Sequence, residues 1–588
     1  MLHFFTKKPI RCSLLFAGVF LCVDYDCWAQ VSIPPDAAIT PGSILQGQQK
    51  PWATPTATPQ PFLPNNAAPQ LQEKDQPWIE LPEDDTPLKD NKTTFFIETI
   101  TIEEMTLLSP EEIQPILETY QHRELTLADL ETLKDKLTKL YIEKGFVNSR
   151  FIIPPQKTID NNLILKAIET TIESIAFEKD RWYTSSSVIP RISIQPGQYF
   201  NVNPLQNSLH WINETPDLKV TAKLLPGSSS KTTRVILTAT DQHPMHLVPY
   251  WDNLGRENIG LSRYGLTLNH NNLVGLGDAL SVSPHFTNRS FGLTGQYNIP
   301  IGAYGTRIGV DYVYSNVALG QELEELEIQS RSHIFSPYIS HPLVYTDRMS
   351  FKTKLSFDFK NLKTDILGAP FSEDRIRALR LNADFTFRDH FGQTIFNHEL
   401  AWGIDALGAT VKSNPLSSKA GSGSQFFRYS GDIIRLQQLP KNILMQVRGH
   451  YQFSENRLLS AEQQQIGGAF SVRGYSEGRI LGDKGYYLNW ETYIPIKPFP
   501  KTWRTPKTYQ YLNSMIQLTT FVDFGQVFTN RQAPGEAQGD SLCGVGVGAR
   551  IQINRFLTAR LDLAFPLIRI YPDNNQPKLH FGLQSSLF

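Results

Sequence analysis

From residue 243 to residue 588 the chain alternates apolar and polar residues. Near the C-terminus, for example, Leu561, Leu563 and Phe565 alternate with Arg560 and Asp562. A period of two is that of a β-strand with one apolar and one polar face. About sixteen such segments divide this region, which predicts an all-β antiparallel transmembrane barrel of 16 strands, with its apolar face toward lipid. A barrel of that size encloses an aqueous lumen.

Two smaller units precede these strands, and both mix helical and strand periodicities. The first, 94–169, opens with a strand and contains two helix-capping sequences, Ser109-Pro110-Glu111-Glu112 and Thr126-Leu127-Ala128-Asp129. The second, 170–242, closes with a hairpin that turns at Pro226-Gly227-Ser228. The predicted order in each unit is β-α-α-β-β, an α+β fold.

Residues 1–29 are typical of a signal peptide, because basic residues precede an apolar run that ends at Cys27-Trp28-Ala29. The alternative is a lipoprotein signal, which needs a small residue directly before its cysteine. Residues 30–93 are rich in proline and predict an extended linker with a candidate short helix at 41–49. Beyond the signal no run of 18 apolar residues occurs, so any membrane crossing is expected to be a barrel.

Composition narrows the function classes. The net charge of −1 gives no electrostatic case for binding nucleic acid. Three of the four cysteines lie in the signal, which leaves Cys543 and no internal disulfide. The 34 Phe and 22 Tyr suit an aromatic-rich barrel exterior, but also the alternative of a large soluble β-sandwich or β-solenoid.

No catalytic, metal or cofactor site is expected. Gly544-Val545-Gly546-Val547-Gly548 lacks the basic residue and helix of a phosphate-binding loop. His243-Pro244-Met245-His246 has a proline between its histidines and no carboxylate cluster nearby, so a metal site is not predicted. We find no set of nucleophile, base and orienting group, and therefore predict a protein that is not an enzyme.

Residues 467–482 are the least strand-like part of the barrel region. Four glycines fall within Gly467–Gly478, and a loop so rich in glycine can fold back into a lumen. Asp523 lies on the polar face of a later strand and should point inward, which places a carboxylate within reach of Arg473. A guanidinium can bind both carboxylate oxygens, which lysine cannot reproduce. The alternative is a surface arginine with no special partner.

These residues also carry a family resemblance. Val472, Arg473, Gly474 and Tyr475, followed by Phe521, Asp523 and Gly525, resemble the paired signature of the BamA-like barrel superfamily. The resemblance implies that the sixth extracellular loop inserts into the barrel and that its arginine bonds the strand aspartate. We call these seven residues the loop–barrel lock.

The first small unit carries a more specific resemblance. Leu125–Leu130, Tyr141–Arg150 and Pro154-Pro155-Gln156 are similar to the first POTRA domain of two-partner secretion transporters, the ShlB/FhaC-like haemolysin secretion/activation proteins. This resemblance implies two POTRA domains in the periplasm, a barrel in the bacterial outer membrane and contact with outer-membrane lipid. It further implies a secreted exoprotein partner of haemolysin or adhesin type, and insertion by the barrel assembly machinery.

Two features depart from that family. A long N-terminal plug helix is common there, whereas only the short segment at 41–49 is present here. The terminal Phe588 matches the C-terminal assembly signal, but Ser586 and Gln584 stand where apolar residues are expected. A bulge would account for that change of phase.

The expected function is capture of an unfolded exoprotein by addition of its backbone to a POTRA sheet edge, then export through the barrel pore. Selectivity is expected from side chains between the helix and the edge of the second unit, namely Leu205, Leu209, Ile212 and Val220. Two alternatives remain: an outer-membrane protein insertase of the same superfamily, and a passive porin.

Overall fold

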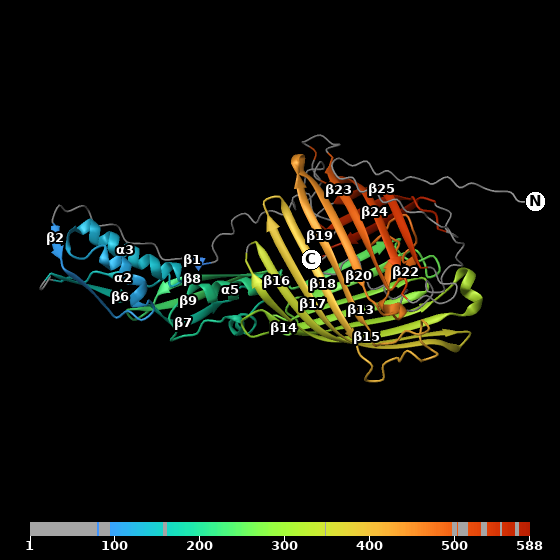
Figure 1. Cartoon of the computed structure of the whole chain (residues 1–588), viewed down its shortest axis with the longest axis horizontal. Helices are drawn as coiled ribbons and strands as arrows, with labels where there is room; N and C mark the ends of the chain where they lie inside the picture. Colours follow the sequence, from blue (N-terminus) through green and yellow to red (C-terminus); the bar gives the residue numbers. More distant parts are fainter. Residues whose placement is uncertain are drawn as a thin grey trace, which may run out of the picture.

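The computed structural model describes residues 79–80, 94–156, 161–346, 348–496, 503, 515–530, 538–552, 556–570 and 576–587. They form an arm of two small units joined to one end of a wide barrel (Figure 1). The expected signal peptide, the candidate helix at 41–49 and Phe588 lie outside the described residues, as does the linker apart from 79–80.

The first unit packs two helices on a three-stranded sheet. In that sheet β6 runs parallel to β3 and antiparallel to β5. Leu133, Leu137 and Tyr141 lie on one face of α3 and are fully buried, which explains why their spacing matched a helix. The elements are β2 (Thr94–Ile97), β3 (Thr99–Glu103), α2 (Pro110–Glu118), β4 (Arg123–Thr126), α3 (Leu127–Glu143), β5 (Arg150–Ile152) and β6 (Asn162–Ile168).

Both expected capping sequences begin helices. Ser109 precedes α2 and exchanges capping-box bonds with Glu112. Thr126 precedes α3, and its hydroxyl accepts a 3.2 Å bond from the backbone N–H of Asp129. Each cap satisfies backbone donors that a helix start leaves unpaired.

A buried carboxylate closes the first unit at its junction with the second. Glu169 accepts bonds from the backbone N–H of Thr106 and of Leu107, at 2.8 and 2.7 Å, and from the Tyr141 hydroxyl at 2.8 Å. Burial alone would raise the pKa of Glu169, but a hydrogen bond from the Thr106 hydroxyl, together with these three, outweighs it and lowers that pKa.

Apart from β2 and β4, which pair with each other in the first unit, the second unit repeats the order of the first, with a single helical turn as its first helix. Its elements are β7 (Thr171–Glu178), α4 (Ser185–Val188), η2 (Ile189–Arg191), α5 (Val202–Asn213), β8 (Leu218–Pro226) and β9 (Thr232–Asp241). The sheet order is β1-β8-β9-β7, where β1 is Ile79–Glu80. The outer edge of β8 therefore carries a short strand from the linker.

The barrel is closed, and each strand runs antiparallel to its neighbours. Its last strand, β27, pairs with its first, β10, and this closure confirms the predicted 16-stranded architecture. The strands are β10 (Met245–Asp252), β11 (Arg263–His270), β12 (Ala279–Thr287), β13 (Ser290–Ile301), β14 (Thr306–Ala318), β15 (Gln329–Tyr345), β16 (Met349–Ile366), β17 (Ala369–Asp389), β18 (Gly392–Gly403), β19 (Phe427–Leu439), β20 (Ile443–Phe453), β23 (Lys484–Pro495), β24 (Ile516–Phe528), β25 (Gly539–Gln552), β26 (Leu557–Pro566) and β27 (Lys578–Ser585).

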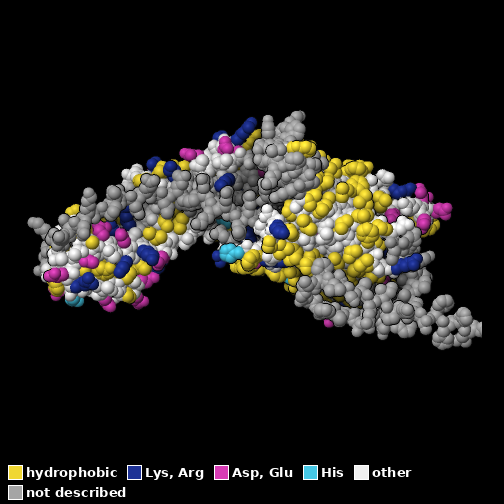
Figure 2. Space-filling view, turned by 90° about the horizontal axis from the view of Figure 1, so that it is seen from above, with side chains coloured by type: hydrophobic (Ala, Val, Ile, Leu, Met, Phe, Trp, Pro, Cys, Tyr) yellow, Lys and Arg dark blue, Asp and Glu magenta, His cyan; other side chains and the backbone are white. Residues whose placement is uncertain are grey.

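On the face of the barrel that Figure 2 shows, apolar side chains cover the outside, whereas charged side chains gather on the arm and at the far end. On β26, Leu561, Leu563 and Phe565 are exposed on the outside, while Arg560 and Asp562 are buried inside. This pattern is the reverse of a soluble protein and is typical of a membrane barrel. No helix among the described residues is long and apolar enough to span a membrane.

Polar contacts join the second unit to the barrel. Asp217 accepts a bond from the Asn271 amide at 2.6 Å and lies 2.7 Å from the His246 ring nitrogen. The Tyr183 hydroxyl donates to the Asn271 carbonyl at 3.3 Å. Asn271 follows β11, so the end of the barrel that contacts the second unit is the end with the β11–β12 turn. Successive strands run in opposite directions, and the β20–β23 connection therefore leaves the barrel at the opposite end.

Candidate functional site

The β20–β23 connection, residues 454–483, enters the lumen and holds the candidate site. It contains a short hairpin of β21 (Gln464–Ile466) and β22 (Ile480–Gly482). The expected loop 467–482 lies within this connection, and its tip includes Gly474 with φ +94°. A Cβ on Gly474 would come within 2.9 Å of the Pro566 backbone nitrogen, so a side chain there is opposed by both conformation and space.

At the tip, Arg473 binds Asp523 on β24 with two nitrogens. Its Nε lies 2.7 Å from Oδ2, and its Nη2 lies 2.9 Å from Oδ1. The Arg473 backbone N–H also donates to Oδ2, at 3.1 Å. Arg473 is 3% exposed and Asp523 is fully buried, so water screens the attraction between the two charges little. Loss of either residue would leave the other as a buried charge without its partner, which is costly.

Two neighbours on the strands fix the orientation of this pair. The guanidinium carbon of Arg473 stands 3.5 Å from the ring centroid of Phe521, which is also on β24. The Asn489 side chain on β23 donates to Asp523 Oδ1 at 2.8 Å. Phe521 and Asp523 share the inward parity that the sequence predicted, because β24 buries alternate residues from Thr519 to Val527.

The pair belongs to a larger buried network. Arg473 Nη1 donates to Glu491 on β23 at 2.9 Å, and Glu491 also pairs with Arg550 on β25. Arg550 in turn donates to Asp562 on β26 at 2.6 Å. With Arg560, which also pairs with Asp562, three arginines face three carboxylates. The charges balance only when the loop contributes Arg473.

The other residues of the expected lock pack around this network. Val472 is fully buried, and its Cγ2 would lie 3.0 Å from a Cβ placed on Gly525. Glycine at 525 thus leaves the room that Val472 occupies. The Tyr475 hydroxyl bonds the carbonyls of Cys543 and Ile568, at 2.9 and 2.8 Å.

The structure therefore brings together all seven residues expected to form the loop–barrel lock. Sequence reasoning missed Glu491 and Arg550, although Arg560 and Asp562 had been placed on a polar face. The inward parity of charged residues on neighbouring strands is the signal that could have found them.

The residues expected to select the substrate lie elsewhere. Leu205, Leu209, Ile212 and Val220 are fully buried in the core of the second unit. These side chains are not open to a substrate, because those on α5 lie on the face that packs on the sheet, and their role in selectivity stays a prediction. Leu205, Leu209 and Ile212 of α5 share this core with Val220 of β8.

A second feature of this unit is the backbone edge of β8, which carries β1. Ala222 and Lys223 pair in parallel with Ile79 and Glu80. Among the described residues, this pairing covers two of the nine residues of β8. An edge strand offers unpaired N–H and C=O groups to an extended chain, so the edge can add a strand.

Comparison with protein families gives two matches. The model of the haemolysin secretion/activation protein family ShlB/FhaC/HecB matches residues 231–551. That of the ShlB-type POTRA domain matches residues 95–170.

Similar proteins and solved structures cover most of the chain. The heme/hemopexin transporter protein HuxB of Haemophilus influenzae is 24% identical over 480 residues, which span 79% of this chain and 81% of HuxB. The outer membrane transporter CdiB of Dickeya dadantii is 22% identical over 511 residues, or 82% and 84% of the two chains. The solved structure of CdiB from Escherichia coli has a TM-score of 0.67 at 18% identity, covering 88% of this chain and 95% of that one. At this identity the structural likeness supports the fold.

Proposed function

Because the chain belongs to the haemolysin secretion/activation protein family ShlB/FhaC/HecB, we propose that it exports one unfolded exoprotein of haemolysin or adhesin type through its barrel. Members of this family are two-partner secretion transporters of the outer membrane, and their POTRA domains lie in the periplasm. The exoprotein is the proposed partner, together with outer-membrane lipid around the apolar band and the barrel assembly machinery during biogenesis.

The observation that carries this proposal is the strand added to β8. The linker residues 79–80 pair with β8 through backbone atoms. Backbone pairing tolerates varied side chains, as capture of an unfolded chain requires. An exoprotein segment would pair along β8 (Leu218–Pro226) and take the place of 79–80.

Passage through the lumen requires the inserted loop to move. Ion pairs hold its tip, and unlike covalent links they can break and re-form without a chemical reaction. Breaking a buried pair costs about 3–5 kcal/mol if its charges stay unpaired. Folding of the exoprotein outside the cell would make the export directional, with no nucleotide consumed.

One observation favours a second candidate, the insertase. In the described part of β27, Gly582–Gln584 pair with Tyr250–Asp252, and Leu587 forms a bridge to Leu247. By contrast, β10 pairs with β11 along its whole length. A seam with so few paired residues could open to admit strands of another membrane protein. A test therefore has to distinguish passage at the seam from passage through the lumen.

Capture at β8 can be tested by fixing the linker strand in place. In a variant with Glu80→Cys and Lys223→Cys in a Cys543→Ser background, where positions 80 and 223 are paired in register, a short thiol crosslinker joins β1 to β8. We expect secretion of the exoprotein to stop on crosslinking and to return with a reducible crosslinker and reductant. The single-cysteine variants control for the reagent, and secretion that persists through the crosslinked protein would rule out β8 as the docking edge.

A further inference from the structure

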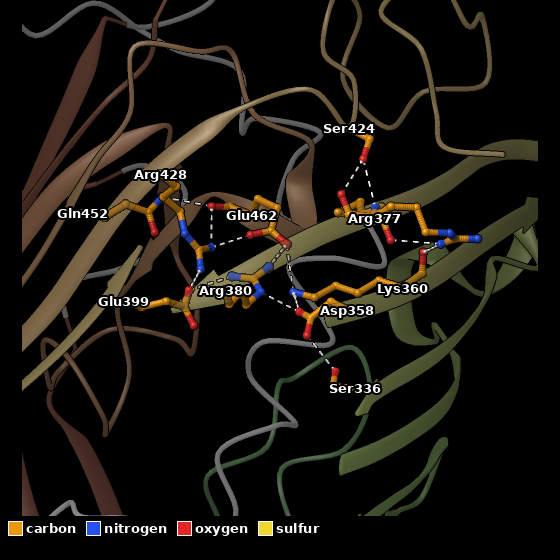
Figure 3. Close-up of polar contacts among 11 residues, drawn as sticks. Ser336, Asp358, Lys360, Arg377, Arg380, Glu399, Ser424, Arg428, Gln452 and Glu462 are labelled. Atoms are coloured by element: carbon orange, nitrogen blue, oxygen red, sulfur yellow. Dashed lines mark hydrogen bonds and ion pairs between the residues drawn. The ribbon is translucent and has the colours of Figure 1, made fainter. Parts of the chain in front are cut away.

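The root of the inserted loop has its own attachment to the barrel wall. Glu462, at the end of a short 3-10 turn (Ser460–Glu462), is fully buried. It accepts bonds from Arg380 on β17 at 2.7 Å, Arg428 on β19 at 2.6 Å and Lys360 on β16 at 2.8 Å (Figure 3). Three cations from three strands thus converge on one carboxylate of the loop.

The barrel strands supply the other carboxylates of this cluster, and among the described residues these are fewer than the cations. Arg380 also pairs with Asp358 on β16 and Glu399 on β18, both at 2.6 Å. Arg428 pairs with Glu399 as well. Among the ion pairs of this cluster, three cations on the strands therefore face two carboxylates on the strands. Removing Glu462 from its place would leave one buried positive charge without compensation, which is costly at low solvent exposure.

The charges around Glu462 are arranged like those around Arg473 at the tip of the loop, but with the signs exchanged. Around Arg473, the strands contribute three carboxylates and two arginines, and the loop supplies the missing cation. Around Glu462, the strands contribute three cations, and the loop supplies the missing anion. The two clusters lie on different strands, β16 to β19 for Glu462 and β23 to β26 for Arg473.

Packing ties the root to the same wall. Leu458, Leu459 and Ala461 are buried against a cluster that includes Ile376 and Ala378 on β17. From β20, the Gln452 side chain donates to the backbone carbonyl of Glu462 at 2.9 Å and to that of Asp483 at 3.2 Å, which joins the two ends of the connection. The root is thus held by charge, by apolar contact and by backbone bonds.

We propose that Glu462, with Lys360, Arg380 and Arg428, is a second closure of the lumen that acts independently of Arg473 and Asp523. This inference rests on the proposed function, because it assumes that the inserted loop blocks the export path. Releasing the tip alone leaves the root against β16–β19, and releasing the root alone leaves the tip against β23–β26. The lumen opens fully only when both attachments are free.

The first test is the conductance of the purified full-length protein in planar lipid bilayers. We expect Glu462→Gln and Arg473→Lys each to raise the open fraction several-fold, and, because the two attachments act independently, the double variant to show the product of the two effects. Glu455→Gln, the same change on an exposed residue of the same segment, is the matched control. The proposal fails if Glu462→Gln behaves like Glu455→Gln, or if the double variant equals Arg473→Lys alone.

A second measurement covers the case in which Glu462→Gln does not assemble into a stable barrel. Ser460 is 1% exposed, so a Ser460→Cys thiol in a Cys543→Ser background reports movement of the root. We expect Lys360→Gln, which removes one of the three cations, to speed its labelling by a membrane-impermeant maleimide. Arg473→Lys should leave that labelling unchanged, because the root stays attached.

Equal labelling in the Lys360→Gln and parent proteins would overturn the proposal, as would faster labelling in Arg473→Lys. Neither readout uses an exoprotein. If both behave as expected but no exoprotein is exported, the proposed function fails while the second closure stands.

Discussion

Arg473 on the inserted loop and Asp523 on β24 form a bidentate ion pair, with Nε–Oδ2 and Nη2–Oδ1 distances of 2.7 and 2.9 Å. The loop thereby completes a charge balance that the barrel strands lack. A segment that enters a lumen and satisfies buried charges is stable in place, yet no covalent bond prevents its departure.

Two substitutions of Arg473 should separate the contribution of its charge from that of its bidentate contact with Asp523. Arg473→Ala leaves buried carboxylates uncompensated and should destabilise the inserted loop by about 3–5 kcal/mol. Arg473→Lys keeps the charge but cannot make the bidentate contact, so an intermediate effect is expected. The measurement is protease cleavage within 454–483 in assembled barrels, with the exposed Arg331→Ala as control. Equal cleavage of Arg473→Lys and the parent would show that the bidentate geometry is dispensable.

Gly474→Ala should also loosen the tip. The left-handed backbone of Gly474 costs an L-residue about 1–2 kcal/mol, and the added Cβ would crowd Pro566. Gly449→Ala on β20 is the matched control, because a Cβ there would meet Leu488 at an ordinary 3.9 Å. Conductance in planar bilayers should rise for Gly474→Ala and not for Gly449→Ala. A rise in conductance for Gly449→Ala but not for Gly474→Ala would contradict the tight fit at Gly474.

Acid should weaken the first unit through Glu169. Its pKa is lowered in the folded protein, so the ionised carboxylate stabilises the fold at pH values above the unfolded pKa of about 4.3. That stability is lost as the pH falls from this value through the folded pKa. The protection of α3 amides against hydrogen exchange, measured relative to their intrinsic exchange rates, should therefore fall in this window, and Glu169→Gln should flatten the dependence.

The control for this pH dependence is the exposed Glu98→Gln, which should behave like the parent. A pH profile of Glu169→Gln identical to that of the parent would remove Glu169 as its source.

The lipid-facing side of the barrel should reject charge. Leu563→Arg on β26 places a guanidinium on the outer face, at a cost of up to about 4 kcal/mol near the bilayer midplane. Leu563→Met conserves the volume and should cost little. Heat-modifiable gel mobility gives the assembled fraction, and equal assembly of the two variants would mean that Leu563 does not face lipid.

Much of the fold was readable from local patterns. The period of two predicted the barrel, because alternate residues of a strand necessarily face lipid and lumen. The same parity pointed Asp523 inward, and the family resemblance supplied Arg473 as its partner. Thr126 and Asp129 predicted the start of α3, since capping depends on neighbouring residues alone.

The remaining features depend on distant pairing. The partnership of Glu491 with Arg550 follows from the register of β23 to β25, which the lengths of the connecting loops do not reveal. Glu462 lies outside any strand, so no periodicity placed it beside Arg380. The strand at Ile79–Glu80 forms because β8 offers an edge, and nothing in a proline-rich linker predicts that.

The most direct test of export through the lumen is site-specific photocrosslinking to an exoprotein stalled during secretion by a tightly folded C-terminal fusion. A photoreactive phenylalanine replaces Tyr338, which lies on the inward-facing side of β15 with the Lys354 Nζ 3.9 Å from its ring centroid. In a second protein it replaces the exposed Trp251 at the seam. We predict crosslinks to the exoprotein from position 338 and none from position 251. Crosslinks from 251 alone, or to unassembled outer-membrane proteins instead of the exoprotein, would contradict export through the lumen.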